Sequence, residues 1–454
     1  MRHGFVQRVA ACLLLSAALI GCGGSSGSSS GTGYVQVLNA ITDSPNLTLT
    51  LDEGQDTEAT VNLSFQESTQ LAQWARGSLT FEVTYEEPDT GATSTVLDTF
   101  TVDIVSDTIH TVYLHGSISN PTVLNLEREF ETNPVVDSGE FSLQIVNLSS
   151  GDAVEAYFVA PDLDLQSEPA TATLASLNAT TATAVASGDK EFHVFYENEA
   201  DPVYQSDPFE VFENARRTLV IHDEPGPDSR LIDVIVLADN GVIEEPNQVA
   251  RTEIRVFNAL AVETSVETAL GTDGSPVTLE FGSASAFSVV DNASLIDLSI
   301  TPASTGEDQL ETISVNRDLF TTAVITKAAN DSADITVASS STSLRPIAGQ
   351  ANLHFINALS STDVTDSTAI DLYLLPFGDG LDEVSPRSSG LNSLAGVTTT
   401  FVSGEVYTLA ITNANSDAIL AHLEISADSG SSVLAVATDA QPGSTARQII
   451  VLQQ

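Results

Sequence analysis

The chain has 454 residues, of which 62 are acidic and 15 are basic, so its formal net charge at neutral pH is −47. A surface of this sign repels nucleic-acid phosphates and anionic lipid headgroups, which argues against nucleic acid as a partner. The length is more than one hydrophobic core usually serves, and it predicts several domains.

The first 33 residues predict export and lipid attachment. A basic start and a short apolar run lead into Leu19-Ile20-Gly21-Cys22, which is the order of a bacterial lipoprotein signal. We therefore expect residues 1–21 to be a signal peptide and Cys22 to carry lipid. The Gly- and Ser-rich residues 22–33 would then form a flexible tether. Gly23, and not an aspartate, follows the cysteine, which favours the outer membrane of the cell envelope as the destination.

Both cysteines, Cys12 and Cys22, lie in this N-terminal region. The rest of the chain can therefore form neither a disulfide nor a cysteine-ligated zinc site. No later segment has the roughly 18 consecutive apolar residues that a membrane helix needs. The lipid on Cys22 is the expected attachment to the membrane.

One strand motif recurs four times along the remaining chain. It reads apolar, polar, apolar, apolar, Asn and then a small or apolar residue, and its first copy is residues 35–40 (VQVLNA). The alternation predicts a half-buried strand, and asparagine suits the strand end because its side chain hydrogen-bonds to nearby backbone. A structural role is expected for the four strand-end asparagines, Asn39, Asn147, Asn258 and Asn357.

Each copy of the motif is followed by further short strands with turn residues between them. About seven strands in roughly 100 residues predict an all-β fold of tandem immunoglobulin-like antiparallel β-sandwich domains. Because the linkers are short, we expect a stiff string of four units. The predicted domains are residues 34–130, 139–240, 250–342 and 350–454.

The repeat resembles the bacterial domain-of-unknown-function family 4397, which occurs in exported and surface proteins. The resemblance rests on Asn39-Ala40 and Asn357-Ala358 at the strand ends and on Ile370-Asp371-Leu372-Tyr373 in the next strand. Of the family's Ser-Pro-Asp-Ala-Pro loop, only Asp43-Ser44-Pro45 remains, in the first copy. The resemblance implies a fold and an exported location, and it implies no defined biochemical activity.

The histidines do not follow a metal-binding or catalytic spacing. His115 and His222 hold equivalent places after a late strand, and the alignment gives Thr326 and Ala437 there in the other units. A polar strand-end role is therefore favoured over metal binding or proton transfer. We expect no catalytic residue, no metal ligand and no cofactor. Two further histidines are expected on the solvent side of their strands, namely His193 and His354.

Carboxylate clusters leave calcium binding open as an alternative. The richest segments are Asp162 with Asp164, and Asp379 with Asp382 and Glu383. Calcium needs six to eight oxygen ligands in a defined loop, and neither segment has the spacing of a known calcium loop. Calcium is therefore a possible partner without a motif to support it.

The sequence favours a non-catalytic protein that is anchored to the cell envelope by lipid and presents its four domains for adhesion or for contact with another envelope protein. The alternative is a periplasm-facing lipoprotein that binds a ligand or a divalent cation. A hydrolase ranks third, because the near-constant repeat spacing leaves no room for an inserted catalytic segment.

Overall fold

The computed structural model describes residues 31–453, except for 53–58, 87–93, 131–136, 162, 164, 166–167, 225–231, 272–273, 291–294, 317–318, 328–334, 344, 361–368, 415, 417 and 441–445. These residues form β-strands and contain no α-helix, so the all-β prediction is confirmed. Within this part of the chain, no helix has the length and apolar character needed to cross a membrane. The predicted signal peptide, Cys22 and most of the tether lie outside the described residues.

The strands fall into four consecutive units. Unit 1 contains β1 (Thr32–Ile41), β2 (Leu47–Asp52), β3 (Ala59–Leu63), β4 (Ala72–Ala75), β5 (Gly77–Glu86), β6 (Ser94–Ile104), β7 (Thr108–Ser117) and β8 (Asn120–Glu129). Unit 2 contains β9 (Glu140–Asn147), β10 (Val154–Val159), β11 (Ala172–Leu174), β12 (Asn178–Ala179), β13 (Thr183–Ala186), β14 (Gly188–Tyr196), β15 (Tyr204–Gln205), β16 (Phe209–Val211), β17 (Arg216–Asp223), β18 (Ile232–Ala238) and β19 (Gly241–Glu244).

The second half of the chain repeats the same order. Unit 3 contains β20 (Thr252–Asn258), β21 (Ser265–Leu270), β22 (Val277–Glu280), β23 (Ser288–Val290), β24 (Leu295–Pro302), β25 (Gln309–Ser314), β26 (Phe320–Lys327) and β27 (Ile335–Thr342). Unit 4 contains β28 (Gln350–Asn357), β29 (Ile370–Pro376), β30 (Ser388–Leu391), β31 (Gly396–Val402), β32 (Tyr407–Asn413), β33 (Ile419–Ile425), β34 (Ser432–Thr438) and β35 (Gln448–Gln453).

Each unit is a sandwich of two sheets. We call the sheet that contains the unit's first strand sheet A and the other sheet B. In unit 1 the order is β4-β1-β7-β8 in sheet A and β3-β2-β5-β6 in sheet B, and units 3 and 4 repeat this order. Unit 2 differs by splitting its edge strands into shorter pieces. The pairing is antiparallel except that the first strand of every sheet A runs parallel to the unit's late strand, as β1 does with β7.

A separate hydrophobic core fills the space between the two sheets of each unit, because alternate residues of a strand point to the same face. The core of unit 1 contains Val37, Leu49 and Phe81, and the core of unit 4 contains Phe355 and Leu409. Units 2 and 3 have equivalent cores of their own. Each unit therefore has a hydrophobic core of its own between its two sheets.

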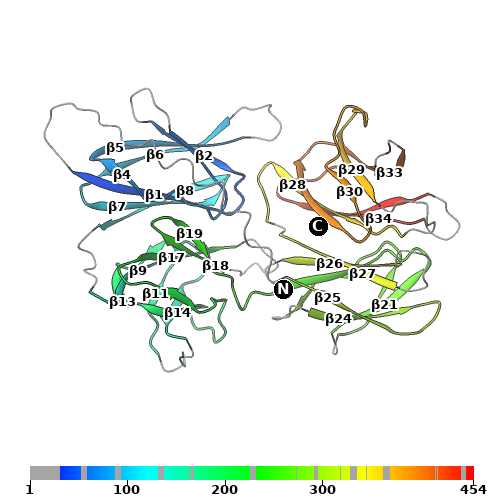
Figure 1. Cartoon of the computed structure of the whole chain (residues 1–454), viewed down its shortest axis with the longest axis horizontal. Coiled ribbons are helices and arrows are strands. Elements are labelled where there is room, and N and C mark those ends of the chain that lie inside the picture. Colours follow the sequence, from blue (N-terminus) through cyan, green and yellow to red (C-terminus); the bar gives the residue numbers. More distant parts are fainter. Residues whose placement is uncertain are drawn as a thin grey trace.

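The units also pack in pairs, with sheet A against sheet A (Figure 1). We call the two contact zones the 1–2 seam and the 3–4 seam. The 1–2 seam contains Leu38 and Tyr113 of unit 1 with Val146 and Ile235 of unit 2. The 3–4 seam contains residues at the same fold positions. The expected stiff string is therefore wrong, since each unit folds back on its neighbour along the chain.

The strand motif explains this pairing. Neighbouring residues on a strand face opposite sides of the sheet. Val37 points into the core of unit 1, whereas Leu38 lies fully buried in the 1–2 seam. The two adjacent apolar residues before the asparagine thus serve two different cores.

The two pairs touch through the segment that connects units 3 and 4. One guanidinium nitrogen of Arg345 donates to the carbonyl oxygens of Thr42 and Ser44 in unit 1, both at 3.0 Å. The same guanidinium lies over the Phe65 ring, 4.9 Å from its centroid. The backbone N–H of Ala348 donates to the Asp43 carbonyl oxygen at 2.9 Å. These contacts join unit 1 to the second pair and give a two-by-two arrangement (Figure 1).

Candidate functional site

The four strand-end asparagines share one geometry. Each is fully buried, and its side-chain nitrogen donates to the carbonyl oxygen of a leucine in an edge strand of sheet B. Asn258 shows the pattern, with Nδ2 3.0 Å from the Leu279 oxygen and Oδ1 accepting from the Leu260 N–H at 3.0 Å. The side chain thereby satisfies backbone groups at a strand end that would otherwise be buried without partners. This geometry supports the structural role that the sequence analysis assigns to them.

A left-handed residue accompanies each asparagine. Gln66 has φ 65° and donates its N–H to the Asn39 carbonyl oxygen at 2.8 Å, and Leu394 has φ 66° and donates to Asn357 at 2.7 Å. Gly282 and Leu177 hold the same place in units 3 and 2. Three of these four residues are not glycine, although a positive φ is costly for other residues. The turn beside the asparagine therefore imposes a positive φ even on residues that disfavour this backbone conformation.

Two histidines lie differently from the prediction. His193 is 6 % exposed, because β14 has β10 and β15 on its two sides and Glu191 Oε2 lies 3.2 Å from the His193 Nε2. His354 is 1 % exposed, because its face of β28 packs in the 3–4 seam, where Nε2 lies 2.8 Å from the Ser340 hydroxyl. The predicted solvent-facing positions are therefore wrong for both. Burial lowers the pKa of each imidazole, to about 4 for His354.

His115 and His222 occupy equivalent positions on β7 and β17, and both are buried. They line a hollow of about 530 Å³ between units 1 and 2. His222 Nδ1 lies 2.9 Å from the Asp223 carbonyl oxygen, whereas His115 Nε2 has no hydrogen-bond partner among the described residues. The strand register shows that the equivalent residue in unit 4 is Thr438, so the alignment that placed Ala437 there is wrong by one residue.

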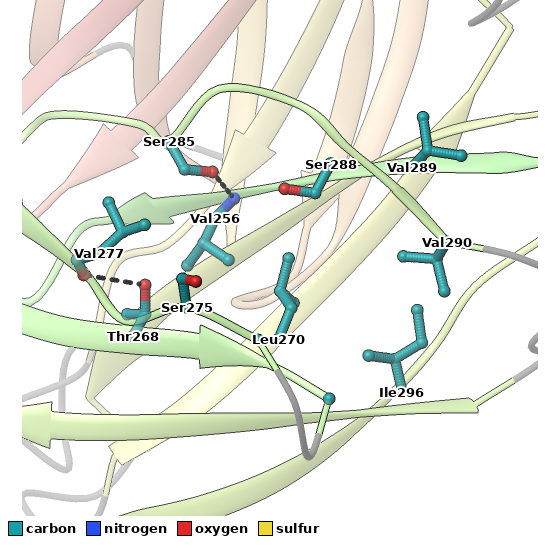
Figure 2. Close-up of a pocket in the computed structure, with 12 residues that line it drawn as sticks. Val256, Thr268, Leu270, Ser275, Val277, Ser285, Ser288, Val289, Val290 and Ile296 are labelled. Carbon is teal, nitrogen blue, oxygen red and sulfur yellow. Dashed lines mark hydrogen bonds between the residues drawn. The ribbon is translucent and has the colours of Figure 1, made fainter.

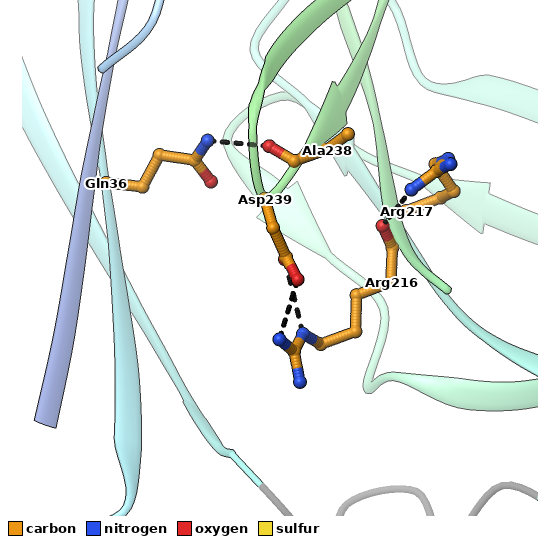
Figure 3. Close-up of polar contacts among 5 residues, drawn as sticks. All are labelled: Gln36, Arg216, Arg217, Ala238 and Asp239. Atoms are coloured by element: carbon orange, nitrogen blue, oxygen red, sulfur yellow. Dashed lines mark hydrogen bonds and ion pairs between the residues drawn. The ribbon is translucent and has the colours of Figure 1, made fainter. Parts of the chain in front are cut away.

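The 1–2 seam has a polar rim (Figure 3). Gln36 Nε2 of unit 1 donates to the Ala238 carbonyl oxygen of unit 2 at 2.7 Å. Beside it, the Arg216 guanidinium forms two hydrogen bonds to the Asp239 carboxylate, at 2.6 and 3.2 Å, and lies 4.3 Å from the centroid of the Phe130 ring. These groups fix the relative position of two apolar faces, which by themselves have no directional contacts.

Unit 3 contains a pocket of about 840 Å³ between its two sheets (Figure 2). It lies beside the edge strands β22 and β23. Leu270, Val290 and Ile296 converge on it from three strands, and Val256 is a further apolar part of its wall. The remaining polar wall consists of hydroxyl groups and backbone, with Thr268, Ser275, Ser285 and Ser288. None of the 12 lining residues is ionisable.

A comparison of equivalent residues in the four units shows why unit 3 has a pocket. At one pair of facing positions in sheet A, an aromatic ring is present in unit 1 (Gly33 with Trp74), unit 2 (Phe141 with Val185) and unit 4 (Ala351 with Phe401). Unit 3 has Thr252 and Val290 at this pair and no ring.

The facing strand of sheet B contributes as well. Thr268 stands where units 1 and 4 have Leu49 and Leu372, and where unit 2 has Ala156. Unit 3 therefore combines a short side chain in sheet B, as in unit 2, with the lack of a ring in sheet A.

Metal ligands do not gather in the described part of the chain, where no group of three His, Cys, Asp or Glu side chains could hold an ion. Asp162 and Asp164 lie outside the described residues. Glu383 folds back onto its own turn, with Oε2 accepting from the Gly380 N–H at 3.1 Å. The calcium alternative therefore gains no preformed site from the described carboxylates.

Sequence reasoning did not identify the pocket or the seam residues. The sequence does contain a signal for the seam, because Leu38 and Ala40 are apolar at positions that alternate with the core residues of the same strand. The pocket depends on cross-strand pairs such as Thr252 with Val290, and strand register is needed to find them.

One family model matches part of the chain. Residues 33–157 match the family described as a domain of unknown function (DUF4397), so the resemblance drawn from the repeats is confirmed over this stretch, which spans unit 1 and the start of unit 2. No curated protein matches the chain.

Among solved structures, the chain is similar to two proteins proposed to act in cell adhesion. One, from Bacteroides uniformis, has 11% identity and a TM-score of 0.21, and the match covers 45% of this chain and 99% of that one. The other, from Bacteroides eggerthii, has 13% identity and a TM-score of 0.15, with 46% and 96% covered. The Bacillus anthracis TIE protein has 11% identity and a TM-score of 0.16, with 90% and 69% covered.

Proposed function

We propose that this chain, whose residues 33–157 carry a DUF4397 domain, is a non-catalytic lipoprotein of the cell envelope that presents four β-sandwich units for adhesion or for contact with another envelope protein. The observation that carries the proposal is the order at the N-terminus: a short apolar run, Leu19-Ile20-Gly21-Cys22 and a Gly/Ser tether. The lipid on Cys22 would hold the folded units at the outer membrane.

The arrangement of the units supports a role in contact. Sheet A of every unit is used in a seam, so sheet B and the connecting loops remain as the surface for partners. Two phenylalanines on this surface, Phe212 and Phe377, are 62% and 71% exposed. Exposed aromatic rings are enriched at the centres of protein interfaces. The surrounding acidic charge would favour a partner with a basic surface.

Mass spectrometry of the protein purified from membranes tests the anchor. We expect acyl groups on Cys22 as the first residue of the mature chain and a soluble, unacylated product for Cys22→Ser. A wild-type protein that begins elsewhere or carries no acyl group would contradict the proposal.

Protease treatment of intact cells tests the presentation at the surface. We expect cleavage from outside the cell, with an unrelated periplasmic protein as the protected control. Protection of the chain in intact cells, with cleavage after the outer membrane is permeabilised, would favour the alternative of a periplasm-facing binding protein.

The alternative has one observation in its favour, the pocket of unit 3. Its cation-binding version is tested by thermal melting with calcium and with a chelator. A calcium-binding protein would melt at a clearly higher temperature with the ion, because a ligand that binds only the folded state stabilises that state. We expect the two melting temperatures to agree.

A further inference from the structure

We infer that the pocket of unit 3 is a binding site for an uncharged aliphatic molecule that carries a hydroxyl or carbonyl group. The pocket volume of about 840 Å³ lies within the range of small-molecule sites in proteins. The inference goes beyond the proposed contact function, since neither the seams nor the exposed aromatic residues take part in it.

Burial and shape define the apolar part of the site. Val256 and Ile296 are 1% and 6% exposed and lie deepest, whereas Val277 and Val289 are 45% and 51% exposed at the rim. An aliphatic chain that enters between β22 and β23 would cover these side chains and displace water from them. A pocket of this kind in an otherwise closely packed sandwich leaves its wall without packing partners until it is filled.

The hydroxyl groups define the polar part. The Ser285 and Thr268 hydroxyls already bond within the unit: Ser285 to the Ala286 carbonyl oxygen, and Thr268 to that of Val277. Ser275 and Ser288 are exposed, and their hydroxyls have no hydrogen-bond partner in the described part of the chain. Figure 2 shows both side chains at the wall of the pocket, where they are free to bond to a ligand's oxygen.

Charge defines the class of ligand. A carboxylate or ammonium group would lose its hydration without gaining an opposite charge from the described lining residues, because none of those is ionisable. The net charge of −47 further disfavours an anion. The described residues that line the pocket include no aromatic ring, so they offer a sugar no surface on which to stack. An uncharged aliphatic ligand satisfies all three conditions.

The test is calorimetric titration of the full mature chain carrying Cys22→Ser, in the absence of detergent, with octan-1-ol, octanoate and glycerol. We expect octan-1-ol to bind one site with a dissociation constant on the order of a millimolar, as its small size implies. Octanoate and glycerol should bind at least about tenfold more weakly, because one carries a charge and the other has no chain. Equal binding of octanoate, or no heat with octan-1-ol up to its solubility limit, would overturn the inference.

The repeats supply the matched variants. Thr268→Leu with Val290→Phe copies Leu372 and Phe401 of unit 4 and should abolish octan-1-ol binding. Phe401→Val removes a core ring from unit 4 and should leave the unit 3 site unchanged. If the double variant fails to fold, Val290→Phe alone should weaken binding by about tenfold or more. Unchanged binding in a folded variant with the pocket filled would place the ligand elsewhere and refute the inference.

Discussion

The side-chain amide of Gln36 in unit 1 donates a 2.7 Å hydrogen bond to the Ala238 carbonyl oxygen in unit 2. Gln36 lies three residues before the strand-end asparagine, and the equivalent residues are Gln144, Arg255 and His354. All four are buried polar side chains on the faces that form the seams. Gln36 and His354 hydrogen-bond across their seams, to Ala238 and Ser340, and such buried bonds restrict how two apolar sheets can slide over each other.

Leu38→Asp should separate units 1 and 2 without unfolding unit 1. The new carboxylate would lie in the apolar 1–2 seam without a cationic partner, which costs several kcal/mol, whereas the core of unit 1 faces the opposite side of β1. Small-angle X-ray scattering should show a larger radius of gyration, and circular dichroism should keep the strand signal. Val61→Asp, at a 43% exposed position on β3, is the control and should change neither measurement. An unchanged radius for Leu38→Asp would refute the seam.

Asn258→Ala should destabilise unit 3 by about 2 kcal/mol, because the change leaves the Leu279 oxygen and the Leu260 N–H buried without these partners. Urea unfolding followed by circular dichroism measures the loss. Asn125→Ala, at an exposed position on β8, is the matched control and should stay within about 0.5 kcal/mol of the wild type. Equal stability of the two variants would show that the asparagine does not hold the strand end.

Local patterns in the sequence predicted the strands and the repeat but not the packing between units. The pair Val37-Leu38 illustrates the limit, because two adjacent apolar residues indicate a strand buried on both faces without showing what covers the second face. Short linkers predict a stiff string of units, yet they equally permit a neighbour to fold back. The prediction that His193 and His354 face water is also wrong, because the alternation of residues in a strand does not show whether its outer face is covered.

The candidate pocket is harder to predict from the sequence than the fold. Thr268 and Val290 are ordinary strand residues when read alone, and only the register shows that they stand where unit 4 has Leu372 and Phe401. In unit 4 the late strand is shifted by one residue from the sequence alignment, and such a slip exchanges core and outer positions. The missing volume could therefore be recognised only after the strands were paired.

Arg345→Ala should loosen the contact between the two pairs and leave both seams intact. The variant removes two hydrogen bonds to backbone oxygens of unit 1 and the guanidinium that lies over Phe65. Limited proteolysis should cut near residues 345–348 faster than in the wild type, and the scattering curve should indicate a more extended particle. Arg387→Ala, also a loss of one arginine charge and at an exposed position, serves as the control for net charge. Identical cleavage rates for wild type and Arg345→Ala would contradict the prediction.

Acid should weaken the 3–4 seam through His354. Burial, and then the positive charge of Arg255, hold the pKa of His354 at about 4, below the ordinary value of 6.5. Above pH 6.5 the imidazole is neutral in the folded and the unfolded chain, so its contribution is constant. Between pH 6.5 and about 4 only the unfolded chain takes up the proton, and the free energy of unfolding falls by about 3 kcal/mol.

Stability measured by urea unfolding from pH 7.5 to 4 checks this slope. His354→Gln keeps a hydrogen-bonding group near Ser340 and cannot titrate, so it should remove the His354 share of the loss. A smaller slope should remain, because burial also lowers the pKa of His110, His115 and His193. If His354→Gln lost stability with pH as steeply as the wild type, protonation in the 3–4 seam would not be the cause.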